Sequence, residues 1–320
     1  MLLPIRNQAL NLLNFSLLER FFYLKKRKVK VGYAARTINL KALDIISSSS
    51  PRLFLNPFDE GFSKEFFLYG FREPLNTLMT YLIIKKKKPI VIDVGANIGY
   101  FTLIALLAGA KHVVSLEPNP ITFSYLIKNV NAFANVTVLN LALNNESRKA
   151  KFVIARHFNL SSLSDSRMYN TIPILKELDV ECVSLSDVLA YVQEGSDILL
   201  RMDIEGGEYK VLSGKIPDPI KIIILELHVY PPFSKSHAVH LIKHLWSEGF
   251  TNITYTRDFP LGWNPIIARI KIRKALKLAD KIGYEEVSIK HASHWSCLAD
   301  EIREWDGLHL FLLRQGNRNF

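Results

Sequence analysis

Short apolar runs alternate with helical patterns through the middle of the chain, and this alternation restricts the fold more than any other feature. Val, Ile and Leu dominate the runs at 89–95, 112–117, 136–143, 197–203 and 220–229. Amphipathic segments such as 120–133 and 236–248 separate these runs. Because strands that are buried on both faces read as continuous apolar runs, the pattern predicts a doubly wound α/β fold, with a mainly parallel sheet between two layers of helices.

Two later segments, 250–256 and 308–314, are predicted to close the sheet as antiparallel strands. The chain between them is rich in charged and aromatic residues, and we interpret it as an insertion that caps a substrate pocket. Residues 50–72 are expected to form a hairpin or loop ahead of the main domain. The predicted division is an N-terminal helical and hairpin extension at 1–72, a main domain at 73–256 plus 307–320, and the insertion at 257–306.

The net charge of +11 bears on possible partners. Much of it lies in two lysine-rich runs, 25–30 and 85–88, and such a surplus can attract nucleic acid, an anionic membrane or an anionic substrate. We favour solvated lysines on surface elements, because the second run follows a helical pattern at 73–84, where cations offset the negative end of the helix dipole. Nucleic acid is therefore the less favoured partner.

Residues 1–24 form a partly apolar, amphipathic segment ahead of the first lysine-rich run. Such a helix usually packs on its own domain, and peripheral contact with a membrane is the alternative. No run of about 18 apolar residues, as a spanning helix would need, is present in the sequence. The two cysteines, Cys182 and Cys297, lack metal-ligand spacing, which is compatible with a reducing compartment. We expect a cytoplasmic protein, with membrane-peripheral contact as the alternative.

A turn that contains two glycines follows the first apolar strand. The strand ends in Asp93, the turn holds Gly95, Ala96, Asn97 and Gly99, and a helical pattern begins directly afterwards. Glycine lets the backbone turn tightly and approach a ligand closely. The spacing G-x-x-x-G matches neither the dinucleotide-binding pattern G-x-G-x-x-G nor a phosphate loop, so the turn alone does not name its ligand.

The second strand ends in an acidic residue. Glu117 lies 24 positions after Asp93 and is followed by Pro118 and Asn119. In a doubly wound sheet, an acid about 20 residues after the first turn reaches the hydroxyls of a ribose bound across that turn. The alternative is a charge that interacts with the N-terminus of the next helix. Together with the glycine turn, Glu117 favours ribose binding.

Three carboxylates and two glycines crowd into the end of the fourth strand. Asp203 ends the strand, Gly206 and Gly207 let the chain pass close to a ligand, and Glu205 and Glu208 lie at the start of the next helix. Because ligands of open α/β sheets bind at the carboxyl edge, we hypothesise that Asp203 faces the reacting centre. The two glutamates would position the substrate or the amino acid end of a cofactor. Helix capping explains one or two of these acids, and a divalent metal site is the rival interpretation.

The fifth strand ends with Glu226 and His228, which point to the same face because they are two residues apart. His228 has the chemistry of a general base with a pKa near neutral. Glu226 would then lie on the substrate side. A hydrogen-bonded structural histidine is the alternative that stays open.

These motifs together resemble the FkbM family of S-adenosylmethionine-dependent methyltransferases. The matching segments are VIDVGANIGYFTL at 91–103, LEPNP at 116–120, NLALNNES at 140–147, LLRMDIEGGEYKVL at 199–212 and LELH at 225–228. The resemblance implies the class I methyltransferase fold, a Rossmann-like doubly wound sheet of seven strands. Asn144 departs from the family pattern, which often has an acid at this place.

The resemblance also implies which residues surround the cofactor, S-adenosylmethionine. The methionine part would be surrounded by Asp93, Gly95, Asn97 and Gly99, with Ala96 in the same turn. Glu117 would bind the ribose hydroxyls. The adenine would lie beside Pro118, Asn119, Leu141 and Ala142.

Members of the family typically methylate hydroxyl oxygens, often on sugars or natural products. The predicted function is therefore O-methylation of a hydroxyl on a sugar, a glycan or a small molecule, with no resident metal. Two alternatives stay open. One is an RNA methyltransferase, which the net charge favours and the acidic cleft motifs disfavour. The other is a module that binds S-adenosylmethionine without catalysis.

Overall fold

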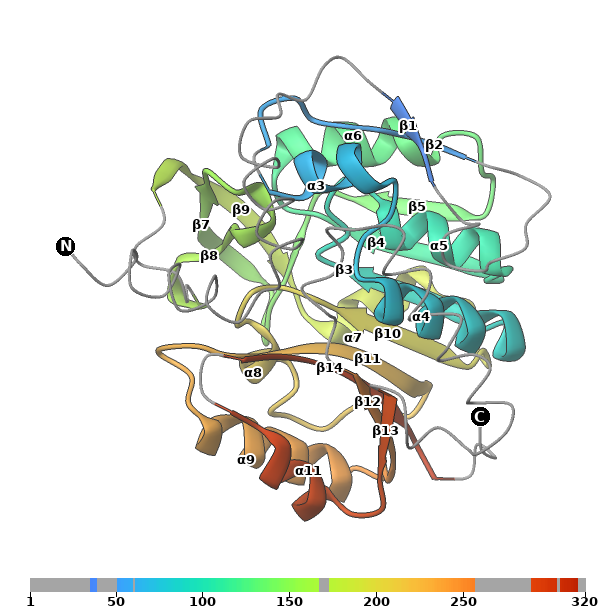
Figure 1. Cartoon of the computed structure of the whole chain (residues 1–320), viewed down its shortest axis with the longest axis vertical. Coiled ribbons are helices and arrows are strands. Elements are labelled where there is room, and N and C mark those ends of the chain that lie inside the picture. Colours follow the sequence, from blue (N-terminus) through green and yellow to red (C-terminus); the bar gives the residue numbers. More distant parts are fainter. Residues whose placement is uncertain are drawn as a thin grey trace, which may run out of the picture.

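The computed structural model describes residues 35–38, 51–59, 61–166, 173–256, 289–303 and 306–315. A large mixed sheet crosses the molecule, with helices on both of its faces (Figure 1). From one edge to the other, its strands are β5 (Val136–Leu139), β4 (His112–Leu116), β3 (Ile90–Val94), β10 (Ile198–Met202), β11 (Ile220–Val229), β14 (Asp306–Leu313), β12 (Asn252–Thr256) and β13 (Ile289–Ala292). The strands from β5 to β11 run parallel, and β14 is antiparallel to both of its neighbours. The prediction of a doubly wound α/β fold is confirmed.

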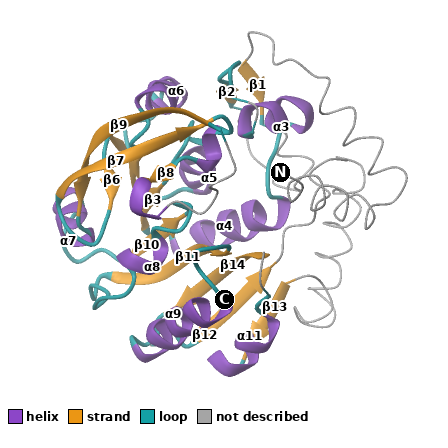
Figure 2. Cartoon of the chain, turned by 90° about the vertical axis from the view of Figure 1, so that its left-hand side faces the viewer, coloured by secondary structure: helices purple, strands orange, loops and turns teal. Residues whose placement is uncertain are grey.

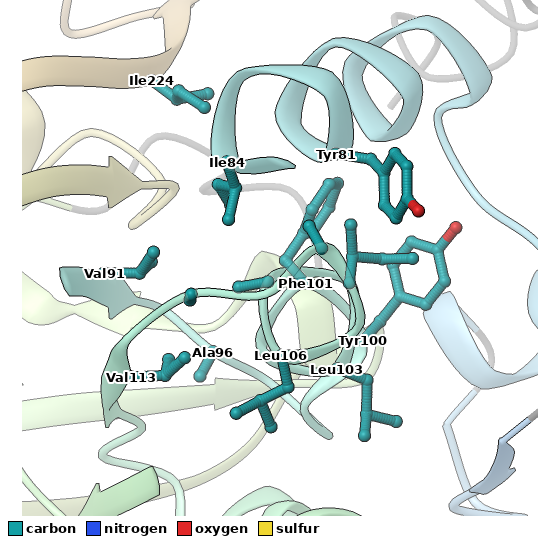
Figure 3. Close-up of a cluster of buried hydrophobic side chains, with 14 of the residues drawn as sticks. Tyr81, Ile84, Val91, Ala96, Tyr100, Phe101, Leu103, Leu106, Val113 and Ile224 are labelled. Atoms are coloured by element: carbon teal, nitrogen blue, oxygen red, sulfur yellow. The ribbon is translucent and has the colours of Figure 1, made fainter. Parts of the chain in front are cut away.

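Alternate residues of the buried strands face two separate hydrophobic layers. Val91 of β3 belongs to the cluster that Figure 3 shows, together with Tyr81 and Phe101 from the helices above it. Its neighbour Ile92 faces the opposite layer. The first layer contains α4 (Pro74–Lys87), α5 (Tyr100–Ala108) and α6 (Pro120–Val130), and the second contains α7 (Leu185–Val188), α8 (Glu208–Val211), α9 (Lys235–Ser247) and α11 (Trp295–Glu301). This period of two within each apolar run explains why both faces of the sheet are covered.

The main sheet has eight strands among the described residues, whereas the sequence predicted seven. The additional strand is β13, which pairs antiparallel with β12 at the edge of the sheet. It lies inside the predicted insertion at 257–306 and leads into α11, whose Leu298 is fully buried in the same layer as α9. The end of the predicted insertion therefore extends the main sheet. Residues 257–288 lie outside the described part of the chain.

Part of the predicted N-terminal extension packs into the core of the main domain. The strands β1 (Ala35–Thr37) and β2 (Arg52–Phe54) form an antiparallel pair, and α3 (Phe62–Tyr69) follows them. The ring of Phe66 in α3 lies 5.3 Å from that of Tyr100 in α5, measured between centroids. Asn129 of α6 accepts a hydrogen bond from the Phe54 amide at 2.6 Å and donates one to the Ile98 carbonyl at 2.7 Å. This side chain therefore ties β2 to the loop in front of α5.

A second, smaller sheet stands beside the carboxyl end of the main sheet (Figures 1 and 2). Its strands, in spatial order, are β6 (Ala142–Leu143), β9 (Ile174–Val183), β7 (Arg148–Ala155) and β8 (Ser162–Leu163). The serine-rich segment that follows β7 contains two short 3₁₀ turns, η2 (Phe158–Leu160) and η3 (Ser164–Ser166), on either side of β8. Residues 167–172 are outside the described part.

The structure describes only the second of the two lysine-rich runs. Lys85, Lys86 and Lys87 form the last turn of α4, which confirms that these cations sit at the negative end of a helix dipole. The first run and the amphipathic segment at 1–24 lie outside the described residues. Among the helices that the structure describes, none combines the length and apolarity needed to cross a membrane.

Candidate active site

The loop after β3 is held tightly against two neighbouring strand ends. The amides of Gly95 and Ala96 both donate to the carbonyl of Leu116, at 3.1 and 3.0 Å. Gly95 has φ +75°, and a Cβ placed on it would lie 2.0 Å from the backbone oxygen of Asp203. This position therefore requires glycine both for its backbone conformation and for its contact with the end of β10.

A glycine-to-alanine pair separates these two requirements. Gly109 also has a positive φ, +87°, but a Cβ placed on it would meet no described atom within 4 Å. We expect Gly109→Ala to lower the free energy of unfolding by about 1–2 kcal/mol, the cost of the left-handed backbone alone. Gly95→Ala is expected to cost about 1–3 kcal/mol more, because the methyl group meets backbone that cannot move aside. Urea unfolding of both variants measures the difference, and equal losses would contradict the close approach to Asp203.

Glu117 is a buried carboxylate at the end of β4. Its side chain is held by backbone amides, because Oε2 accepts a hydrogen bond from Asn97 and Oε1 accepts one from Asn119, both at 2.9 Å. Burial raises the pKa of Glu117 to about 7, against the opposing effect of these two bonds. Each carboxylate oxygen keeps a second lone pair. Glu117 can therefore accept further hydrogen bonds from ligand hydroxyls that enter beside it.

Two other residues predicted to touch the cofactor serve helix ends instead of the cavity wall. Asn119 is the N-cap of α6, and its Oδ1 accepts a hydrogen bond from Ile121 N at 3.0 Å. Gly99 is the N-cap of α5 with φ +91°, and a Cβ there would lie 2.8 Å from Leu126 Cδ1. Both residues shape the ends of loops whose neighbours line the cavity, so their contact with the cofactor stays a prediction.

Sequence reasoning missed Arg201, which organises the centre of the site. Its guanidinium donates through Nη1 to Asp93 Oδ1 at 3.1 Å and through Nη2 to Asp203 Oδ2 at 3.3 Å. The guanidinium carbon lies 3.8 Å from the centroid of the Phe101 ring, a cation–π contact. The signal was present in the sequence, because an arginine in the apolar run LLRM is buried and a buried arginine needs an anionic partner.

Asp93 lies beneath the cavity, where it supports Arg201. Its side chain is 1% exposed, and its second oxygen accepts a hydrogen bond from Thr102 Oγ1 at 2.7 Å. A carboxylate with both oxygens occupied in this way fixes the guanidinium in place. The predicted contact between Asp93 and the cofactor stays a prediction.

Asp203 faces the cavity at the end of β10. Burial and the nearby carboxylate of Glu226 raise the pKa of Asp203 to about 7, and Arg201 opposes this shift. At neutral pH this carboxyl is therefore divided between its protonated and ionised forms. A group with these properties exchanges a proton near the working pH of most enzymes.

His228 lies among three carboxylates. Its Nε2 is 3.5 Å from Glu205 Oε2 and 3.4 Å from Glu226 Oε1, and its Nδ1 is 3.7 Å from Glu208 Oε1. Burial alone would lower the pKa of His228, but Glu205 and Glu226 outweigh it and raise the pKa well above its usual range. The expectation of a near-neutral pKa is therefore wrong. The raised pKa favours the protonated ring, which disfavours a role as general base.

The two glutamates after Asp203 have different surroundings. Glu208 is fully buried, and its oxygens accept hydrogen bonds from the amides of Ile204 and Gly206, both at 2.8 Å. Glu208 therefore holds the loop before α8, as the helix-capping interpretation expects. It does not line the cavity. Glu205 does line the cavity, with φ +55° and 7% exposure, and burial raises its pKa well above the usual range. Among the described residues, its Oε2 has no hydrogen-bond partner.

One cavity joins these groups, with about 1170 Å³ of empty space including its open mouth. Residues predicted from the sequence form much of its wall, namely Gly95, Ala96, Asn97, Glu117, Pro118, Leu141, Ala142, Asp203, Glu205, Glu226 and His228. The rest of the wall includes Phe152, Phe158 and Ser162, from the small sheet and the turn beside it, and Arg72 and Glu73 before α4.

The end of the cavity near β4 fits the nucleoside part of a cofactor. Glu117 offers a buried carboxylate for ribose hydroxyls, and Leu141 and Ala142 offer apolar surface to a flat base. The Gly95 loop brings backbone close to the same space. A nucleoside with a free ribose requires a carboxylate that accepts hydrogen bonds from its hydroxyls and apolar surface that packs against its base.

Residues 93–251 match the family model described as the methyltransferase FkbM domain. No curated protein matches the chain. Similar solved structures include an S-adenosylmethionine-dependent methyltransferase from Agrobacterium tumefaciens, at 9% identity and a TM-score of 0.41 over 89% of this chain and 72% of that one. They also include an O-methyltransferase from Bacillus cereus, at 12% identity and 0.32 over 77% and 83%. A candidate RNA methyltransferase from Pyrococcus horikoshii has 11% identity and 0.35 over 92% and 98%.

These structural scores are low, so the fold assignment depends on the strand order and on the family match. The order from β5 to β12, with β14 reversed between β11 and β12, is the Rossmann-like arrangement implied by the sequence motifs, extended at its edge by β13. The matched region covers the glycine turn, Glu117, Asp203 and His228. Residues 93–251 therefore form a methyltransferase FkbM domain.

Proposed function

We propose that the chain uses S-adenosylmethionine to methylate a hydroxyl oxygen of a sugar, a glycan or a small molecule. The observation that carries this proposal is the continuous cavity, which has Glu117 at one end and Asp203 with Glu226 at the other. When bound, S-adenosylmethionine supplies a methyl group on a positively charged sulfur, so that the oxygen–carbon bond forms as the sulfur–carbon bond breaks, the sulfur keeps the electron pair, and the hydroxyl proton leaves to a base.

The residues near β4 would bind and orient the cofactor. Glu117 accepts hydrogen bonds from the ribose, Leu141 and Ala142 pack against the base, and the Gly95 loop lets backbone approach the methionine part. Several of these groups are fixed before any ligand arrives, because Glu117 and Gly95 are already held by backbone hydrogen bonds. Such preorganisation reduces the entropy that binding must overcome.

Asp203 is the proposed proton acceptor for the acceptor hydroxyl. Its raised pKa of about 7 makes it a stronger base than an ordinary aspartate. Arg201 keeps the carboxylate in place through a contact of 3.3 Å to Oδ2. Glu205 and Glu226 line the same end of the cavity and would hydrogen-bond to other hydroxyls of the acceptor. This arrangement suits a polyhydroxylated acceptor.

The charge of the cavity wall supports a hydroxyl acceptor over RNA. Five acids line it, Glu73, Glu117, Asp203, Glu205 and Glu226, against the arginines Arg72 and Arg201 and the His228 cation. Because burial raises the pKa of Glu117, Asp203 and Glu205, these acids are only partly ionised at neutral pH. The described wall still lacks the surplus of positive charge that nucleic-acid sites present. Binding of transfer RNA that weakens steeply with salt would favour the RNA alternative instead. Cofactor binding without methyl transfer to any fraction of a cell extract would favour a non-catalytic module.

Replacing Glu117 tests the cofactor end of the proposal. Glu117→Gln removes a charged partner of the ribose, and a hydrogen bond to a charged group contributes about 1.5–3 kcal/mol. We therefore expect the affinity for S-adenosylmethionine, measured by calorimetry, to fall by about 10–100-fold. The exposed Glu181, whose side chain keeps 58% of its accessible surface, gives the matched control Glu181→Gln, which should bind as the wild type does. Wild-type affinity in Glu117→Gln would refute the ribose role.

The same variant has a second readout in the ligand-free protein. The pKa of Glu117 is raised from 4.5 to about 7 in the folded state, so its contribution to stability is lost as the pH rises through this window. Glutamine does not titrate. Between pH 5 and 8, the stability of the variant relative to the wild type should therefore increase by about 1–3 kcal/mol. Thermal unfolding across this pH range measures the change, and parallel curves would contradict the buried, raised carboxyl.

A further inference from the structure

Glu73, Glu226 and His309 come together at the end of the cavity that lies away from Glu117. One potential ligand atom from each of the three lies within 4.8 Å of the other two. Glu226 and His309 are directly opposed in the antiparallel pair of β11 and β14. Opposed residues in such a pair carry their side chains on the same face, with Cβ atoms about 4.5–5.5 Å apart. The sheet itself therefore builds two of the three ligands.

We propose that Glu73, Glu226 and His309 bind a divalent transition-metal ion. Three donors at these separations can surround one ion at about 2–2.5 Å from each. Two carboxylates and one imidazole suit Mn²⁺, Fe²⁺ or Zn²⁺ better than Mg²⁺ or Ca²⁺, which prefer oxygen ligands alone. Glu73 and Glu226 line the cavity, so the remaining coordination positions of the ion face the space where an acceptor would bind.

An independent observation marks the same end of the cavity as a ligand site. Glu205 is 7% exposed, and its Oε2 has no hydrogen-bond partner among the described residues. This oxygen lies 3.5 Å from His228 Nε2, which is itself 3.4 Å from Glu226 Oε1. Buried polar atoms normally have a partner. A water or hydroxyl on the ion would supply that partner to Glu205.

A second group, formed by Asp203, Glu208 and His228, has similar separations but is less suited to a metal. Both oxygens of Glu208 already accept backbone hydrogen bonds. The Nε2 of His228 already faces the carboxylates of Glu205 and Glu226, at 3.5 and 3.4 Å. Glu73 is easier to release. Its Oε1 accepts a hydrogen bond from Arg72 Nε at 2.8 Å and its Oε2 accepts one from Asn76 Nδ2 at 2.9 Å, and both partners are side chains. The Arg72 side chain is 20% exposed. A partly exposed arginine can turn toward water when an ion takes its place.

Metal binding at this site does not depend on the proposed function, but its use in catalysis does. Glu226 and Asp203 line one end of the same cavity. An ion held by Glu73, Glu226 and His309 would bind an oxygen of the acceptor and hold the hydroxyl toward Asp203. The resulting requirement is an acceptor with two neighbouring oxygen atoms, one for the ion and one for the methyl group.

The test is a titration of the full chain with Mn²⁺, in which electron paramagnetic resonance reports the free ion. We expect saturable binding by the wild type, and a loss of at least about tenfold in affinity for both Glu73→Gln and His309→Ala. His240→Ala is the matched control, because His240 is exposed on α9, where His237 and His244 also lie near one surface pocket and can bind transition metals weakly. The control should stay within about twofold of the wild type.

Two further measurements keep the test decisive. Thermal unfolding without metal shows whether each variant is folded, and Glu73→Gln, at a half-buried position outside the strands, covers the case in which His309→Ala fails to fold. No saturation by the wild type, or unchanged binding by folded Glu73→Gln, would overturn the site. Calorimetry with S-adenosylmethionine on the same samples separates the two proposals. Cofactor binding without Mn²⁺ binding refutes the metal site alone, and the reverse result refutes the proposed function alone.

Discussion

The Asp203→Asn variant is expected to bind S-adenosylmethionine about as tightly as the wild type while its rate of methyl transfer falls by about 10²–10⁴-fold. The amide has nearly the same shape as the carboxylate and can still accept the hydrogen bond that Arg201 donates at 3.3 Å. It cannot take up a proton at the end of the reaction. Transfer of a radiolabelled methyl group to the fraction of lipids, glycans or RNA that the wild type labels measures this loss.

The pH profile separates a chemical role of Asp203 from a structural one. The base must be ionised to accept a proton, and burial raises the pKa of Asp203 to about 7. The wild-type rate should therefore increase as the pH rises toward 7 and level off above it, whereas the variant should lack this dependence. Asp218→Asn is the matched control, because that side chain is 83% exposed before the start of β11. A full rate in Asp203→Asn would exclude Asp203 as the proton acceptor.

The Arg201→Met variant should lose more stability than any other single change discussed here. Removing the guanidinium leaves Asp93, which is 1% exposed, without its cationic partner. Stranding one member of a buried ion pair costs about 3–5 kcal/mol. Denaturant unfolding at neutral pH measures the loss. Lys149→Met, which breaks an exposed pair with Glu181, should change stability by less than about 1 kcal/mol.

A double variant identifies the cause of that loss. In Arg201→Met with Asp93→Asn, no charge is left unpaired, so most of the lost stability should return. The coupling between the two changes then measures the buried pair. If the double variant is as unstable as the sum of the single ones, the loss comes from the packing of Arg201 on Phe101 and not from the stranded charge.

The sequence predicted the parts of the fold whose signal lies within one run of residues. Apolar runs with β-branched residues identified β3, β4, β10 and β11, and acids at the ends of such runs pointed to one edge of the sheet. Glu117, Asp203 and Glu226 do line one cavity there. This inference succeeded because parallel strands bring their carboxyl ends to the same edge, whatever the details of side-chain packing.

The remaining features depend on three-dimensional contacts that residue spacing does not reveal. Whether Glu208 faced a substrate or its own loop was decided by the two backbone amides that donate to its carboxylate. The pKa of His228 is raised by the nearby carboxylates of Glu205, Glu208 and Glu226, which come from two different segments of the chain. His309 meets Glu226 only because of the register between β11 and β14. Sequence patterns within one segment carry no information about such register.

The wall formed by Phe62, Arg72 and Glu73 lies ahead of the family-matched region, which begins at residue 93. On the proposed function, a chain trimmed to that region would keep Glu117 and lose part of the wall where the acceptor would bind. Substitutions in the segment before residue 93 would change this wall and leave Glu117 in place. Relatives with one donor chemistry could in this way diversify the molecules that they modify.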